Sequence, residues 1–584
     1  MAHQPPARRS TTGPLPAWVG WHRPRLPGRE LPAPEGRLRR ALVRGVALAA
    51  LGVSGVYLVW RIGWTLELAV WWLSIPLVAL EVHAALGLGL FAFSLWDVDR
   101  RPAVERLASE LGARYLTRPD NRHAKAGNLN HALEVVEADF IAVLDADHVA
   151  APDFLVHTLG YFDDPRVALV QTPQDFYNET SFEHETQRRE PDRFHEQVLF
   201  YRVIQPGKNR WGAAFWCGTG AVVRVAALRD VGGVATDTIT EDIHTTIRFH
   251  RRGWRTVYHN EVLARGLAAS DAATYQLQRH RWGTGAMQVL RVENPLVVSG
   301  LTLGQRLAYA ATLLGWFDAW RSLGYLLLPI VVVATGAVPI RADAATFGVA
   351  FGSTFVLQQL ALRVLSRGCH RPVLSTVFEL VRMTPNLLAT TTLLTNRRAT
   401  FRVTPKGRTA DGRRPPRAPL LLRTVLVLSV AAAAWYGLTL AGLTPVRYAV
   451  PWAVHAAFGW LVVNALLVGL AVRRVRSLRF AGERRAAVRF EVDLPGRFAD
   501  GPCRVLDLSL IGARIATLGE PPGDGIHELL VVVDERPLAL QAVIRTSQLA
   551  GDGRTVCGLE FSPGQTSERA ALALELFRTR ALPV

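Results

Sequence analysis

Long apolar segments alternate with polar blocks along the chain. Six segments have about the 20 apolar residues that a helix needs to cross a bilayer, at residues 41–60, 69–95, 322–340, 345–365, 420–440 and 448–472. The links within each pair of segments are short, whereas the stretches outside the pairs are long and rich in Arg. Because basic residues concentrate on the cytoplasmic side of membranes, this pattern predicts six spans with both termini in the cytoplasm. Glu81 and His83, inside the second span, are expected to face protein or a polar path.

The polar blocks differ in pattern. Residues 97–306 alternate strand-like apolar runs with helical periodicity, which predicts an α/β domain with an open sheet. Residues 366–419 contain an apolar helix with a basic edge and an internal Pro, predicted to lie in the membrane interface. Short β-branched runs near the end predict a small all-β barrel followed by a helix at 567–578. The predicted order begins with a disordered basic tail (1–40), two spans (41–96) and the α/β domain (97–306). An interfacial helix with two spans (307–365) and a second interfacial helix with a loop (366–419) follow. Two further spans (420–472) lead to the barrel (473–584).

Composition separates two classes of function. The chain of 584 residues is 49% hydrophobic and carries a formal net charge of +18. A basic, apolar chain indicates a membrane protein or, less directly, a nucleic-acid binder. Its Arg residues cluster beside the apolar segments and no nucleic-acid-binding motif accompanies them, so we interpret them as flanks of membrane helices. The four Cys, at 217, 369, 503 and 557, show no metal-ligand spacing and support no disulfide.

Two acids follow a strand-like run in "FIAVLDADHV". Asp145 and Asp147 are two residues apart and therefore point to one face at the strand's carboxyl end, where ligands of open α/β sheets bind. Two such carboxylates repel each other unless a cation lies beside them, and Mg²⁺ or Mn²⁺ prefers oxygen ligands and bridges to phosphates. The alternative is a solvated Asp pair that caps the next helix, and for an isolated pair this alternative is favoured.

Lysine is rare in this chain. Only Lys125, Lys208 and Lys406 are Lys among the 67 basic residues. Lys125 opens the predicted helix "AKAGNLNHAL", where its ammonium and the helix N-terminus could both meet a diphosphate. Lys208, in "PGKNRWG", is either a further functional ammonium or an ordinary surface residue.

Five motifs occur in a fixed order: HAKAGN, DxD, FWCGT, TED and QxxRW, the last with Gln278, Arg281 and Trp282. Together they resemble the processive family 2 glycosyltransferases of the cellulose synthase type. The stretches "VQTPQDFYN" and "FRVTPKG", at 170–178 and 401–407, resemble further pieces of bacterial cellulose synthase catalytic subunits. The resemblance implies a multi-domain membrane protein in the plasma membrane, with a transmembrane helical bundle and a cytoplasmic α/β domain of GT-A-like fold. It also implies that UDP-glucose is polymerised into β-1,4-glucan and the product passed across the membrane. A periplasmic accessory subunit and a different β-linked polysaccharide stay open.

The resemblance also implies roles for single residues. Inversion at the sugar requires a base that takes the acceptor's proton, which in the family is the Asp of TED, here Asp242 beside Glu241. The metal at Asp145 and Asp147, Lys125 and Arg281 would stabilise the leaving diphosphate, and Trp282 would offer a flat face to a sugar ring. Acceptor contacts are implied for Phe215, Cys217, Gly218 and Thr219, and a gating loop over the nucleotide for Phe401, Val403, Thr404 and Lys406.

The C-terminal block carries a second resemblance. Arg485 and Arg489 form an RxxxR pair, and a DxSxxG motif follows at Asp507, Ser509 and Gly512. This combination looks like a PilZ domain, which binds cyclic di-GMP. Two Arg four residues apart can fork onto phosphates and stack on guanine. Activation by cyclic di-GMP through the gating loop is implied by the resemblance.

The chain departs from the family in one place. The family's catalytic domain begins with two strands that build the uridine pocket, the first with a PxYNE-like motif and the second ending in an Asp pair before Gly. Neither occurs here, and "DRRPAVERLASELGARYL" resembles what normally follows them. Asp97 or Asp99 is the candidate replacement for a lost Asp. The alternative function is therefore a catalytically impaired membrane receptor for cyclic di-GMP.

Overall fold

The computed structural model describes residues 37–94, 122–135, 137–178, 181–185, 194–395, 416–480, 490–499 and 501–518, and between 523 and 576 chiefly three strands and part of the segment after them. Residues 1–36 of the predicted tail lie outside this described part, as do Asp97 and Asp99. So do six predicted site residues: Phe401, Val403, Thr404, Lys406, Arg485 and Arg489.

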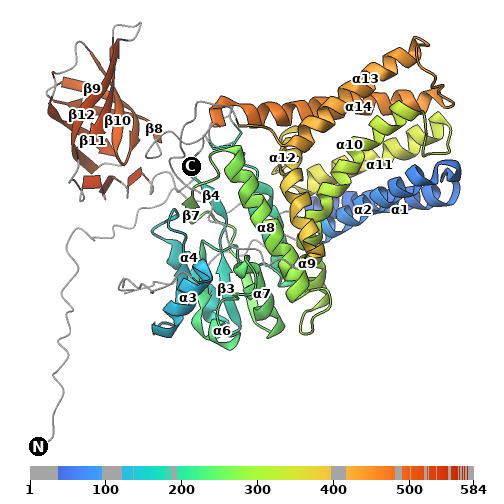
Figure 1. Ribbon diagram of the computed structural model, residues 1–584. Coiled ribbons are helices and arrows are strands. Elements are labelled where there is room, and N and C mark those ends of the chain that lie inside the picture. The colour runs from blue at the N-terminus through green and yellow to red at the C-terminus, as the bar shows by residue number, and fades with distance from the viewer. Residues whose placement is uncertain are drawn as a thin grey trace, which may run out of the picture.

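Six segments of the described chain are long and apolar enough to cross a membrane, which confirms the predicted number of spans. The helices that form them are α1 (Arg37–Trp64), α2 (Trp71–Ser94), α10 (Asp318–Thr335), α11 (Ala344–Leu365), α13 (Leu420–Leu440) and α14 (Pro451–Arg476), which run side by side in Figure 1. Their outer faces expose large apolar side chains, such as Val56 at 72% and Val349 at 74%, which suits lipid and not water. The helix α10 ends five residues before the predicted limit, because Gly336 adopts a left-handed φ of 73° and closes it.

Two further helices adjoin these six, and the first belongs with α10 to one apolar segment, Leu303–Thr335. In α9 (Leu303–Leu314), Thr302 and Gln305 form a capping box that satisfies the first backbone N–H groups. The predicted helix with an internal Pro is α12 (Pro372–Thr391), which contains Pro385. Its Phe378 is fully buried in one apolar cluster with Tyr275 of α8 (Ala272–Val292) and Val468 of α14. Figure 1 shows α12 between α8 and the membrane helices, so it joins the two parts by packing.

The α/β domain contains a four-stranded sheet. The strand order is β1 (Phe140–Val143), β5 (Ala221–Arg224), β3 (Val167–Gln171) and β6 (Arg255–Tyr258). Here β3 and β6 are parallel, and β5 is antiparallel to both β1 and β3. The sheet is therefore mixed. The loop before β5 lies at the edge where β1, β3 and β6 end, and β5 therefore runs in the opposite direction to these three strands. The carboxyl ends of β1, β3 and β6 meet at that edge with the loop before β5.

A smaller sheet and several helices surround this one. Its strands are β2 (Val149–Ala150), β7 (Ala264–Gly266) and β4 (Gln174–Phe176). The remaining helices of the domain are α3 (Ala124–Val135), α4 (Phe154–Leu159), α5 (Gln205–Lys208), α6 (Val225–Asp230) and α7 (Glu241–Arg251). Among the described residues, no strand pairs with the outer edge of β1.

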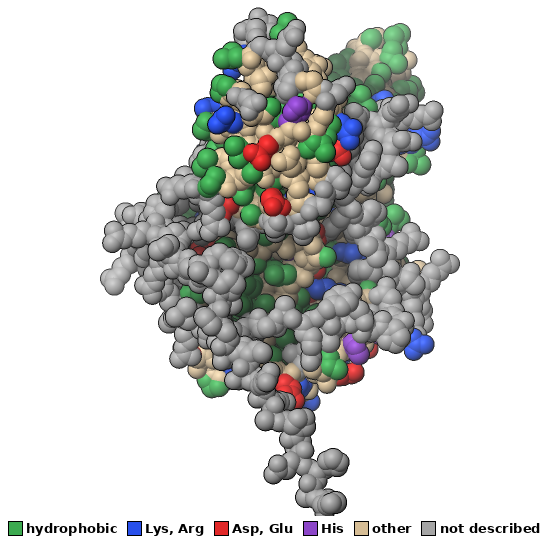
Figure 2. All heavy atoms as spheres, turned by 90° about the vertical axis from the view of Figure 1, so that its left-hand side faces the viewer, with side chains coloured by type: hydrophobic (Ala, Val, Ile, Leu, Met, Phe, Trp, Pro, Cys, Tyr) green, Lys and Arg blue, Asp and Glu red, His purple; other side chains and the backbone are tan. Residues whose placement is uncertain are grey.

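The C-terminal block is a closed antiparallel barrel, as predicted. Its strands are β8 (Phe490–Phe498), β9 (Gly501–Ser509), β10 (Gly512–Leu518), β11 (Ile526–Val533), β12 (Arg536–Leu549) and β13 (Arg554–Phe561). Leu572 and Leu576, four residues apart, are buried in the barrel core, as expected for the apolar side of the predicted final helix. Figure 2 shows the barrel face, where acidic and basic side chains lie among apolar ones.

Candidate active site

Two carboxylates and one imidazole lie together after β1. Oxygens of Asp145 and Asp147 and a ring nitrogen of His148 are within 4.8 Å of one another. Asp147 is fixed from two sides, because its Oδ2 accepts the Leu267 N–H at 2.9 Å and its backbone oxygen accepts the Tyr177 hydroxyl at 3.1 Å. Neither ring nitrogen of His148 has a hydrogen-bond partner among the described residues, although both are buried. The arrangement can hold a divalent cation, and His148 is a candidate ligand that the DxD motif alone does not indicate.

Lys125 connects this corner to the loop before β5. Its Nζ lies 2.5 Å from Oδ1 of Asp145 and also donates to the Gly218 carbonyl oxygen. The two residues before it, His123 and Ala124, have φ values of 58° and 44°, so the chain adopts a left-handed conformation where α3 begins. This turn places the ammonium at the N-terminus of α3, as the sequence predicts.

The loop with Cys217, Gly218 and Thr219 is held by side-chain amides. Gln171, at the end of β3, accepts the Cys217 N–H at 2.8 Å and donates to the Thr219 carbonyl at 2.7 Å. Gln174 donates to the Cys217 carbonyl at 2.7 Å. The Thr219 hydroxyl in turn accepts the Asp145 N–H at 2.9 Å. Both glutamines belong to the "VQTPQ" stretch, whose resemblance to the family points to this region without indicating their role.

Asp242 occupies the first turn of α7. Gly218 has a φ of +86°, which favours glycine, and a Cβ built on it would lie 3.2 Å from Oδ2 of Asp242, so the loop and this carboxylate are in close contact. Burial and the neighbouring charge of Glu241 raise the pKa of Asp242 to about 7. Burial also raises the pKa of Glu241. A carboxylate that titrates near neutrality is suited to accept a proton from a hydroxyl.

The helix α8 carries Gln278, Arg281 and Trp282, and it brings Arg281 and Trp282 to the same region. Burial lowers the pKa of Arg281, against the opposing charges of Glu241, Asp242 and Asp145, so this guanidinium lies among the acids of the site. Oε1 of Gln278 is buried without a hydrogen-bond partner in the described residues. The ring of Trp282 carries the Arg279 guanidinium over its face at 4.5 Å.

Glycines bring α8 close to its neighbours. A Cβ on Gly285 would lie 2.3 Å from Cγ2 of Thr240, the residue before Glu241, and one on Gly283 would lie 2.7 Å from Cβ of Ala389 in α12. The "RWGTG" sequence therefore lets the helix with Arg281 and Trp282 pack directly against Thr240, the residue before α7, and against α12.

A cavity of about 1390 Å³ runs from this site between the membrane helices. Its walls include Phe215, Cys217, Asp242 and Trp282 at one end and side chains of α2, α10, α11 and α14 along its length. Aromatic rings of the membrane helices line it at Phe347, Phe351, Phe355, Trp452 and Trp460. Asp145 and Asp147 are not in its wall. Asp145 adjoins it through Lys125 and Gly218, so Asp145, Lys125, Gly218 and Asp242 lie in one continuous region.

Lys208 is not a surface residue. Its side chain is fully buried, lies over the Phe215 ring at 4.4 Å from the centroid, and donates to the Thr312 hydroxyl. Burial lowers its pKa to about 7, with an opposing contribution from Cys217. Of the two interpretations left open, the structure therefore excludes the exposed one and places this amine in the wall of the cavity.

In the barrel, the DxSxxG residues shape a turn. Oγ of Ser509 donates to the Gly512 carbonyl at 2.9 Å, and Asp507 pairs with Arg514 at 2.9 Å. A Cβ on Gly512 would lie 2.1 Å from the Leu559 carbonyl oxygen, so this glycine lets β10 and β13 pair. Tyr177, whose hydroxyl reaches Asp147, packs against the barrel's apolar cluster. Tyr177 thus links the barrel to the corner of Asp145, Asp147 and His148.

Comparisons with known proteins agree with these motifs. Residues 95–285 match the family described as glycosyltransferase like family 2, and residues 229–366 match the family described as cellulose synthase. The cellulose synthase 1 catalytic subunit (UDP-forming) of Komagataeibacter xylinus is 38% identical over 344 residues, which cover 57% of this chain and 46% of that protein. The cellulose synthase catalytic subunit (UDP-forming) of Pseudomonas fluorescens is 40% identical over 251 residues, which cover 42% of this chain and 34% of that protein.

A solved mannosyltransferase from Pyrobaculum calidifontis, in complex with GDP-Man and Mn²⁺, is 19% identical over 47% of this chain and 68% of that one. Its TM-score of 0.32 is too low to support an argument. The predicted resemblance to bacterial cellulose synthase catalytic subunits is confirmed, and so is the glycosyltransferase class of the catalytic region. The chain spans less than half the length of the two relatives named above.

Proposed function

We propose that this protein is a membrane-embedded, inverting, processive glycosyltransferase that polymerises UDP-glucose into β-1,4-glucan. The proposal places it in the plasma membrane with its catalytic domain and barrel in the cytoplasm. The observation that carries it is Asp242, a partly buried carboxylate with a pKa of about 7, in the wall of a cavity that continues between membrane helices. A product made at this end has a path across the membrane that begins at the base.

In the proposed reaction, the acceptor is the non-reducing end of the growing glucan. Asp242 accepts the proton of its hydroxyl, the oxygen forms a bond to the anomeric carbon, and the bond to the UDP oxygen breaks. Lys125 and Arg281 offer positive charge to the leaving diphosphate. Trp282 stacks on a sugar ring in the cavity wall, where Phe215, Cys217 and Gly218 contact the acceptor.

The residues at the end of β1 fit a divalent cation. Asp145 and Asp147 offer oxygen ligands for Mg²⁺ or Mn²⁺, and His148 offers a nitrogen that Mn²⁺ accepts more readily than Mg²⁺. When bound, the cation would neutralise charge on the diphosphate. Lys125 now neutralises Asp145, so its ammonium would turn from this carboxylate to the phosphates as the cation binds.

The proposal includes activation by cyclic di-GMP, with Arg485 and Arg489 on its phosphates and guanines and the turn of Asp507, Ser509 and Gly512 beside them. Support comes from the contact of the barrel cluster with Tyr177, which donates to Asp147. A ligand that shifts the barrel would thereby move Tyr177 and change the position of Asp147.

The test uses the full-length chain purified in detergent and supplied with UDP-glucose. We expect UDP release that requires Mg²⁺ or Mn²⁺, rises with cyclic di-GMP, and leaves a polymer that a β-1,4-glucanase digests. Release of UDP without a polymer that this glucanase digests would contradict a β-1,4-glucan product and favour another β-linked polysaccharide.

A second candidate is a cyclic di-GMP receptor with an impaired transferase domain. The observation that favours it is the outer edge of β1, which has no partner strand among the described residues, so no described strand offers a uridine pocket there. This candidate predicts that radiolabelled cyclic di-GMP binds the purified chain while UDP-glucose is not turned over under any of these conditions.

A further inference from the structure

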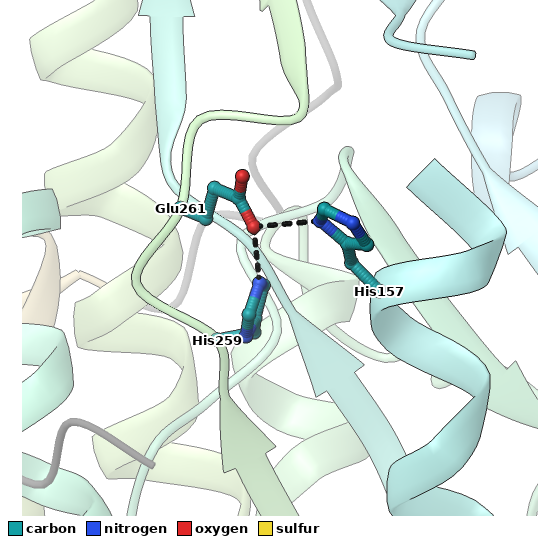
Figure 3. A group of neighbouring side chains, drawn as sticks. All are labelled: His157, His259 and Glu261. Carbon is teal, nitrogen blue, oxygen red and sulfur yellow. Dashed lines mark hydrogen bonds and ion pairs between the residues drawn. The ribbon is translucent and has the colours of Figure 1, made fainter. Parts of the chain in front are cut away.

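Two imidazoles and a carboxylate meet on the side of the α/β domain, apart from the residues of the proposed reaction. His157 lies in α4, and His259 and Glu261 lie in the connection from β6 to β7. Figure 3 shows both rings directed at one oxygen of Glu261. Nδ1 of His157 is 2.8 Å from Oε2 and Nε2 of His259 is 2.9 Å from it. Ligand atoms of all three lie within 4.8 Å of one another.

The opposite nitrogen of each ring faces an oxygen. Nε2 of His157 lies 3.6 Å from Oδ2 of Asp153, and Nδ1 of His259 lies 3.1 Å from the Tyr161 hydroxyl. This is the pattern around metal-bound histidines, in which the far N–H is held by a carboxylate or another oxygen and the near nitrogen is thereby left to bind the ion.

The charges at His157 also favour a cation. Its ring lies between the carboxylates of Glu261 and Asp153, so a neutral imidazole must direct an unprotonated nitrogen at one of them. Oδ1 of Asp153 is moreover buried without a hydrogen-bond partner among the described residues. A divalent ion bound to the near nitrogen removes this conflict, because His157 then donates its remaining N–H to Asp153.

We propose that His157, His259 and Glu261 bind a transition metal of the zinc class. Two nitrogens and one carboxylate oxygen, completed by water, form a common zinc ligand set, whereas Mg²⁺ and Ca²⁺ prefer oxygen. At metal–ligand distances of about 2.0–2.1 Å, tetrahedral ligands lie about 3.3 Å apart. The two nitrogen–oxygen distances, 2.8 and 2.9 Å, therefore have to widen by about half an ångström. His157 and Glu261 are partly exposed, at 21% and 12% of their side chains, so an ion has access from solvent.

The bound ion would tie α4 to the segment that leads into β7. The Ala151 N–H donates to the Leu263 carbonyl at 2.7 Å, and Leu267 donates to Asp147 beyond β7. The two segments that the metal joins therefore flank the strand pair β2–β7 behind the proposed catalytic corner. The ion would therefore hold these two segments together. It stands independently of the proposed function.

The experiment measures metal and not turnover. The full-length chain, purified in detergent with a tag that contains no histidine, is stripped with EDTA, loaded with Zn²⁺ and desalted, and bound zinc is measured by mass spectrometry. We expect about one zinc per chain. Zinc is lost in His157→Ala and Glu261→Gln and retained in two controls, the surface variant His131→Ala and the DxD variant Asp145→Asn. Asp153→Asn should retain the site with an affinity about 10- to 100-fold weaker.

X-ray absorption at the zinc edge of the wild-type chain gives an independent readout, should a variant not fold. Two imidazole nitrogens at about 2.0 Å with oxygen ligands are expected. The proposal is overturned by a wild-type chain that retains no zinc, by zinc that persists in both His157→Ala and Glu261→Gln, or by zinc that only Asp145→Asn removes.

Discussion

The close packing of α8 against the loop before Asp242 can be tested by adding one methyl group. In Gly285→Ala, the new Cβ would lie 2.3 Å from Cγ2 and 2.5 Å from Oγ1 of Thr240. Ordinary contact begins near 3.4 Å, so the helix and the loop have to separate by about 1 Å. Thr240 is β-branched and sits directly before Glu241, so the displacement is passed to the carboxylate of Asp242.

Stability and turnover should respond differently. Overpacking lowers the free energy of unfolding by about 1–3 kcal/mol. Replacing a helical Gly by Ala raises it by about 0.5–1 kcal/mol, so the net loss is about 1 kcal/mol. A misplacement of about 1 Å between catalytic groups reduces a rate by about 100-fold. We therefore expect turnover of UDP-glucose to fall by about 10- to 100-fold in a chain that remains folded.

The assay compares turnover with thermal unfolding in the same detergent. The matched control is Gly348→Ala in α11, whose Cβ would meet nothing within 4 Å and which should turn over like the wild type. The double variant Gly285→Ala/Thr240→Ala removes the two nearest atoms and leaves a Cβ at 2.9 Å, so it should recover part of the lost rate. Wild-type turnover in Gly285→Ala, or no recovery in the double variant, would refute the reasoning.

Three further predictions rest on other contacts. Because the pKa of Asp242 is raised to about 7, the base is protonated below that pH; log kcat/KM should rise with a slope of one up to about pH 7 and then level, and a flat profile down to pH 5 would contradict it. Gln171→Leu leaves the partly buried Cys217 N–H without its Gln171 partner and should lower the free energy of unfolding by about 1–3 kcal/mol in denaturant melts, whereas an unchanged midpoint would count against this role. Gly512→Ala should disrupt the barrel and abolish cyclic di-GMP binding, measured by equilibrium dialysis, because the Leu559 carbonyl leaves no room for a side chain; unchanged binding would disprove it.

Local patterns predict much of the fold. Runs of about 20 apolar residues identify the six spans because each must satisfy its backbone within one helix. Alternating β-branched runs identify the barrel. The end of "FIAVL" places Asp145 and Asp147 at the carboxyl edge of β1, where Lys125 also lies. In these cases the residues that determine the structure lie within the same short segment of the sequence.

Long-range contacts account for what the patterns miss. The direction of β5 depends on a turn whose geometry no periodicity encodes. Gln171 reaches across to Cys217, and Gly285 matters only because Thr240 lies opposite. Similarly, His157 and Glu261 are 104 positions apart in the chain, so their spacing resembles no metal motif. Each of these requires the tertiary fold to bring the two partners together.

The role of Asp242 as the base is the central claim, and one paired measurement tests it. UDP-glucose binding and turnover are determined on the same preparations of the wild type, of Asp242→Asn and of Asp237→Asn, a control that alters a surface ion pair with Arg248. A general base contributes about 10²- to 10⁴-fold, so Asp242→Asn should bind UDP-glucose as the wild type does while its turnover falls by at least about 100-fold. Turnover by Asp242→Asn equal to that of Asp237→Asn would contradict the account.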